Sequence, residues 1–87
     1  MNTEKPSKIA VVAIIINDFD AVEKVNAIIH DFRDYVIGRM GVPYKEKNVN
    51  VISVVLDAPC ETLNGLAGKL GMIKGVKSKL LVAGACK

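Results

Sequence analysis

Arg39 is the side chain best suited to holding a ligand, and it lies in the stretch DYVIGRMGVPYKEK that begins at Asp34. Its planar guanidinium can grip a carboxylate or a phosphate with two parallel hydrogen bonds. Gly38 and Gly41 flank it, which leaves room for a ligand or another backbone to approach. We therefore expect Arg39, with its neighbours Met40 and Gly41, to contribute to a ligand site. The plainer interpretation, an exposed cation on an edge strand, stays open.

Patterns typical of catalysis and metal binding are missing from the sequence. The single histidine, His30, lies beside an apolar helical stripe and faces Asp34 one turn on, which is typical of a solvated helix residue. The sequence shows no nucleophile–base pair, and no glycine-rich phosphate loop precedes an expected helix. Cys60 and Cys86 form no CxxC pair and are too few for a zinc site. We therefore expect no enzymatic activity, no bound metal and no cofactor.

The composition favours a small domain that associates with other copies of itself. With 87 residues the chain forms one domain, yet 51% of its residues are hydrophobic and only 24% are charged. A core of this size cannot hide so much apolar surface, so self-association is the simplest outlet. The net charge of +3 comes from scattered lysines rather than a cluster. Direct nucleic-acid binding is therefore not expected.

The N-terminal segment gives no sign of export or membrane insertion. Residues 1–7 are polar and lack the apolar core of a signal peptide, and the apolar run over residues 9–16 is far too short to span a membrane. We expect a flexible tail over residues 1–7 and a single domain over residues 8–87. We also expect a cytoplasmic protein whose two thiols stay reduced.

The hydrophobic pattern predicts four strands and two helices. The strands are expected at residues 8–16, 35–42, 49–56 and 76–82, and the helices at 21–32 and from 58 to about 70. Asp20 with Glu23 fits a capping box for the first helix, and Gly71 suits a left-handed C-cap for the second. Leu63, Leu66, Ala67 and Leu70 form the apolar stripe of that second helix.

The order of these elements predicts an α+β fold of the ferredoxin-like βαββαβ type. This is a two-layer sandwich in which both helices cover one face of a four-stranded antiparallel sheet. The second strand is then an edge strand, where two glycines and Pro43 are tolerated. Asn17 and Asp18 follow the first strand; they suit a turn, but ferredoxin-like sensor domains hold small ligands there, so we add both to the candidate site.

Both faces of the two central strands are apolar, although the helices can cover only one face. A second copy of the chain is the economical cover for the open face, as a homodimer or a homotetramer. The expected interface residues are Ile9, Val11, Ile15, Val49, Val51 and Val55. The open face lacks the aromatic residues on the third strand with which an RNA recognition motif stacks bases.

The stretch DYVIGRMGVPYKEKNVNVISVVLDAP, together with LAGKLGMIKGVKSK, resembles the iron-only hydrogenase system regulators. These are small ACT-like proteins related to the C-terminal domain of the nickel-responsive repressor. The resemblance implies an ACT-like regulatory domain that is linked to a hydrogenase system. It does not extend to a nickel site, because this chain has one histidine, or to the repressor's DNA-binding domain, because only about seven residues precede the first strand.

The sequence thus predicts an ACT-like regulatory module that oligomerises and binds a small-molecule effector or a protein partner. Ligand binding at a subunit boundary would shift the populations of two arrangements. Two alternatives stay open. One is a constitutive structural or interaction protein without a ligand, and the other is a DNA-binding transcriptional regulator.

Overall fold

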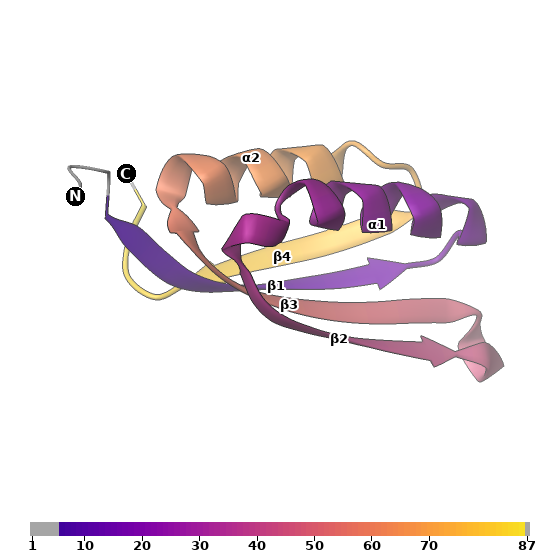
Figure 1. Ribbon diagram of the computed structural model, residues 1–87. Coiled ribbons are helices and arrows are strands. Elements are labelled where there is room, and N and C mark those ends of the chain that lie inside the picture. Colours follow the sequence, from indigo (N-terminus) through magenta and orange to yellow (C-terminus); the bar gives the residue numbers. More distant parts are fainter. Residues whose placement is uncertain (1–5, 87) are drawn as a thin grey trace.

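The computed structural model describes residues 6–86. Four antiparallel strands form one sheet in the order β2-β3-β1-β4, and two helices lie together on one side of it (Figure 1). The strands are β1 (Ser7–Ile16), β2 (Val36–Tyr44), β3 (Val49–Pro59) and β4 (Val76–Val82), and the helices are α1 (Val22–Asp31) and α2 (Cys60–Gly71). The α+β, ferredoxin-like and ACT-like fold is therefore as predicted. The tail expected over residues 1–7 falls mostly outside the described residues, and Ser7 belongs to β1.

The core lies between the helices and one face of the sheet. Alternate residues of β1 and β3 point toward the helices, as the two-residue period of a strand requires. The buried apolar residues are Ala10, Val12, Ile14, Ile16, Ile52, Val54, Leu56 and Ala58 from the strands, with Ala21, Val25, Ile29, Leu63, Leu66 and Leu70 from the helical side. Burying each larger aliphatic side chain stabilises the fold by about 1.5–3 kcal/mol. The stripe predicted for α2 is largely confirmed, since its three leucines are fully buried.

The edge strand β2 runs two residues further than predicted, through Pro43 to Tyr44. Pro43 pairs with Asn50, and its missing N–H is tolerated because β2 has no neighbour on its outer side. A short 3₁₀ turn over Lys45–Lys47 then leads to Asn48, whose φ of 55° lies in the left-handed region that asparagine tolerates.

Two predictions about helix ends are wrong. Asp18, not Asp20, is the cap: its carboxylate accepts a hydrogen bond from the Asp20 backbone N–H at 3.0 Å and starts a 3₁₀ turn before α1. At the other helix, Gly71 still lies within α2. A left-handed glycine lies four residues further on, at Gly75, whose φ of +83° allows the tight turn directly before β4.

The prediction of two reduced thiols is also contradicted. Cys60 and Cys86 form a disulfide with a Cα–Cα distance of 5.6 Å. Cys60 is the first residue of α2, and Cys86 follows β4 near the C-terminus. The expectation of reduced thiols followed from the expected cytoplasmic location, and 26 residues separate the two cysteines in the sequence. The fold brings them together because α2 and β4 pack side by side.

Candidate functional site

A bulge in β2 decides the direction in which Arg39 points. Val36 pairs with Leu56 and faces the helices, but Ile37 and Gly38 together oppose the single residue Val55. The extra residue reverses the alternation of the strand from that point onward. Arg39 consequently pairs with Val54, a core residue, and its side chain lies on the helix side of the sheet.

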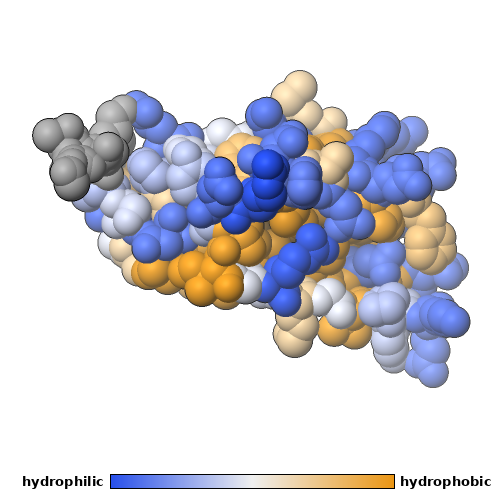
Figure 2. Space-filling view, in the orientation of Figure 1, coloured by the Kyte–Doolittle hydropathy of each residue, from blue (hydrophilic) through white to orange (hydrophobic). Residues whose placement is uncertain are grey.

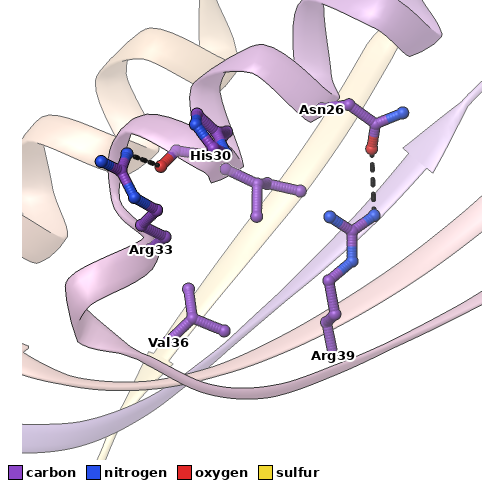
Figure 3. Close-up of a pocket in the computed structure, with 6 residues that line it drawn as sticks. Asn26, His30, Arg33, Val36 and Arg39 are labelled. Carbon is purple, nitrogen blue, oxygen red and sulfur yellow. Dashed lines mark hydrogen bonds between the residues drawn. The ribbon is translucent and has the colours of Figure 1, made fainter.

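Arg39 extends from β2 to α1, where its Nη2 donates a 3.0 Å hydrogen bond to Oδ1 of Asn26 (Figure 3). The two residues close one end of a cleft of about 330 Å³ between the helix and the edge strand. The other lining residues are Ile29, His30, Arg33 and Val36. Ile29 is buried in the core, whereas Asn26, His30, Arg33 and Arg39 are exposed. The cleft therefore has an apolar floor and polar, water-accessible walls.

Arg33 lies on the opposite side of the cleft from Arg39 (Figure 3). Its Nη1 donates a 3.0 Å hydrogen bond to the backbone carbonyl of His30, in the last turn of α1. Helix termini leave such carbonyls without a helical partner, so this contact fixes the guanidinium by satisfying one of them. The two guanidiniums are thus held by neutral oxygens, and neither forms an ion pair within residues 6–86.

The residues predicted for a ligand site are not brought together. Arg39 lies in the cleft, but Met40 points to the opposite face of the sheet and is 64% exposed. Gly41 faces the helix side, opposite Ile52. Asn17 and Asp18 lie at the end of β1 next to β4, two strands away from β2.

Asn17 and Asp18 make structural hydrogen bonds at the end of β1. The Asn17 backbone N–H donates to the Gly75 carbonyl at 2.8 Å, and Asp18 caps the following turn. A small cavity of about 80 Å³ near this loop is lined by other residues, among them Phe19 and Tyr44. That volume holds little more than ordered water.

Sequence reasoning missed Asn26 and Arg33 as cleft residues and gave His30 no function. A usable signal was present, because positions 26, 30 and 33 follow the four- and three-residue steps of one helical face. The sequence did not reveal that this helical face lies opposite Arg39 of β2. The bulge that turns Arg39 toward it has no distinct mark in the hydrophobic pattern of β2.

The open face of the sheet is strongly apolar. The expected interface residues Ile9, Val11, Ile15, Val49, Val51 and Val55 all lie on it, by the register of the strands. The edge strands add Met40, Val42, Tyr44 and Leu81 to the same face. Figure 2 shows hydrophobic side chains along the side of the molecule where the sheet lies, and mainly hydrophilic ones over the helices. Leu81 is 73% exposed, and Ile15 is 43% exposed although its strand is central.

Residues 6–86 hold no group of three or more His, Cys, Asp or Glu side chains arranged to bind a metal ion. No helix in this part of the chain is both long and apolar enough to cross a membrane.

Comparisons with known proteins place the chain in one family. The family described as "TM1266-like: Iron-only hydrogenase system regulator, putative" matches residues 8–80. Among solved structures, the uncharacterized protein TM1266 from Thermotoga maritima is 31% identical and superposes with a TM-score of 0.84. That match covers 87% of this chain and 96% of the other.

A more distant structural neighbour is a formyltetrahydrofolate deformylase from Pseudomonas putida KT2440, with 16% identity and a TM-score of 0.63. It shows a likeness of fold alone, over 87% of this chain and 29% of that enzyme. No curated protein matches the sequence. The match over residues 8–80 carries the conclusion: the chain belongs to the TM1266-like family of iron-only hydrogenase system regulators.

Proposed function

We propose that the protein is a regulatory module that self-associates through the open face of its sheet and responds to a small molecule or a protein partner. The family supports the regulatory role, and the uncovered apolar face supports the self-association. The assembly is a homodimer or a homotetramer. Within it, an effector that binds two arrangements of the subunits differently shifts their populations.

The carrying observation is the apolar character of the open face on both central strands. An antiparallel sheet that faces water normally alternates apolar and polar residues. Here Val11, Ile15, Val51 and Val55 surround the Ala13–Ser53 pair in the middle of the face that the helices leave uncovered. The charged residues of this face lie toward its margins: Asp57 is near the end of β3, and Lys77 and Lys79 are on the edge strand β4. An apolar centre with a polar rim is typical of protein interfaces.

The size of the face suits a subunit interface. Four strands spaced about 4.8 Å apart and about seven residues long cover roughly 19 by 24 Å. This projected area, about 460 Å², is within a factor of two of the ~800 Å² of accessible surface that each partner buries in a standard interface. A second copy presents the same apolar surface, so a two-fold axis in the plane of the face covers both sheets.

The proposed location is the cytoplasm. The disulfide between Cys60 and Cys86 is unusual for that compartment, where thiols are kept reduced. The redox state of this pair in cells is therefore a direct check on the proposed location.

Val51→Lys tests the proposed interface. Val51 lies between Ile15 of β1 and Val42 of β2, near the middle of the open face. A lysine there would bury an unpaired charge in the assembly, so we expect light scattering to show monomers or aggregates in place of the parent oligomer. Met72→Lys is the matched control, because Met72 is an 86% exposed hydrophobic residue at the end of α2. Equal masses for the parent and both variants would overturn the proposal.

A further inference from the structure

The cleft between α1 and β2 gathers every arginine and the only histidine of the chain. Of twelve basic residues, ten are lysines and two are arginines, and both arginines line this one cleft. The lysines are spread over the rest of the sequence. Arginine is the residue that recognises planar anionic groups through two parallel hydrogen bonds, whereas lysine acts as a point charge. The distribution marks this cleft as different from a generally basic surface.

The free polar atoms of the cleft are almost all hydrogen-bond donors. Arginine can only donate, so the Asn26 atom that faces Arg39 is its oxygen, and its amide nitrogen is left to donate elsewhere. Each guanidinium has more N–H groups than its single hydrogen bond uses. No aspartate or glutamate among residues 6–86 lines the cleft. A ligand that satisfies these donors must bring acceptor oxygens.

The charge balance of the cleft is positive. The C-terminal end of α1 contributes a partial negative charge of about half a unit, which opposes an anion. Arg33 covers one of the carbonyls responsible, and the two guanidiniums carry two full positive charges. Neither charge is neutralised by an ion pair in residues 6–86. The cationic contribution therefore dominates.

We propose that this cleft binds a small organic anion, whose phosphoryl or carboxylate oxygens lie between Arg39 and Arg33. Asn26 fixes the guanidinium of Arg39 in advance, so less side-chain entropy is lost when the anion binds. Ile29 and Val36 form an apolar floor for a short non-polar portion of the ligand. The volume of about 330 Å³ lies at the lower end of ligand cavities and limits the occupant to a small metabolite.

The anion is the small molecule to which the proposed regulatory module would respond, so this inference rests on the proposed function. The cleft lies on the helix side of β2, whereas the proposed interface lies on the other side of the sheet. Anion binding and oligomer mass can therefore be measured separately, and the failure of one is distinguishable from the failure of the other.

The test is a titration of the full chain, followed by two-dimensional ¹H–¹⁵N NMR, with inorganic phosphate and with butyrate. Butylammonium, which has the same carbon chain and the opposite charge, is the control ligand. We expect saturable shifts at Asn26, His30 and the Nε–H groups of Arg33 and Arg39 with the two anions, and none with butylammonium. Tighter binding of phosphate would identify the ligand as a phosphoryl compound, and tighter binding of butyrate would identify it as a carboxylate.

Asn26→Asp is the decisive variant, because it keeps the contact with Arg39 but supplies an internal carboxylate that occupies the guanidinium. We expect it to weaken anion binding about ten-fold, the effect of losing one charge-assisted hydrogen bond. Lys74→Gln changes the net charge by the same amount at an exposed lysine outside the cleft, and should leave the affinity nearly unchanged. Arg39→Lys keeps the positive charge but lacks the planar fork, so this variant should retain only part of the parent's affinity for the anion.

Equal weakening by Asn26→Asp and Lys74→Gln would overturn the proposal, because the anion would then be responding to net charge alone. Shifts spread over the lysines, or the absence of saturable shifts with both anions, would also overturn it.

Discussion

The direction of a single side chain, Arg39, depends on one extra residue in its strand. With regular alternation after Val36, Arg39 would point to the open face and Met40 to the helices. The bulge at Ile37 and Gly38 exchanges them, so the cation reaches Asn26 and the flexible apolar Met40 joins the apolar face. Both surfaces for which we propose a function depend on this exchange.

Gly75 is a second residue whose backbone decides a contact. Its φ is +83°, and a Cβ added there would lie 2.6 Å from the Cβ of Asp18. Gly75→Ala should therefore lower the free energy of unfolding by about 1–3 kcal/mol, from left-handed strain and from displacement of the Asp18 turn. Urea unfolding measures the change.

Gly68→Ala is the control for that measurement. An added Cβ at Gly68 meets no atom within 4 Å, and the residue lies inside α2. This variant should raise the free energy of unfolding by about 0.5–1 kcal/mol, because alanine favours a helix over glycine. Equal effects of the two substitutions would contradict the role assigned to Gly75.

The Tyr44 hydroxyl donates a 2.7 Å hydrogen bond to Oε1 of Glu46, and this bond raises the pKa of Tyr44 above its ordinary value of 10.0. Because the folded pKa lies above the unfolded value, the contribution to stability is present below pH 10 and is lost as the pH rises through the raised pKa. Glu46→Gln should bring the pKa of Tyr44 down. Phenolate absorbance in a Tyr35→Phe background measures it, and an unchanged titration would show that the bond is absent in solution.

At the scale of the elements, the sequence predicted what depends on local periodicity. The four strands, the two helices and the edge position of β2 follow from apolar spacing and from the glycines and Pro43. The bulge and the cleft were not predictable in the same way. They depend on which residue of β2 pairs with which residue of β3, and a polar-free run such as Val36 and Ile37 suits either register.

The disulfide is a further element-level contact that spacing did not reveal. It ties the segment after β4 to the first residue of α2 across 26 residues of sequence. In the chain-entropy account, closing a loop of this length stabilises the fold by about 3.5 kcal/mol. Reductant should lower the free energy of unfolding by an amount of that order, measured in urea.

A double variant, Cys60→Ser with Cys86→Ser, should have the lower stability from the start and no response to reductant. A count of free thiols in the unreduced chain accompanies the measurement. Two free thiols, together with unfolding that does not respond to reductant, would restore the original expectation of reduced cysteines.

For the whole molecule, the main feature is the contrast between the two faces of the sheet. One is covered by α1 and α2, and the other is apolar and uncovered in the single chain (Figures 1 and 2). The sequence was sufficient to predict this contrast, because both residue sets of β1 and β3 are apolar while both helices lie on one side. It was not sufficient to identify what covers the open face, since that depends on a contact between molecules.

The most direct test of self-association is the mass of the unmodified protein in solution, measured by sedimentation across a dilution series in the micromolar range. The account predicts at least twice the 9.4 kDa of one chain, with dissociation only on dilution. A stable, soluble species of 9.4 kDa at every concentration would contradict it.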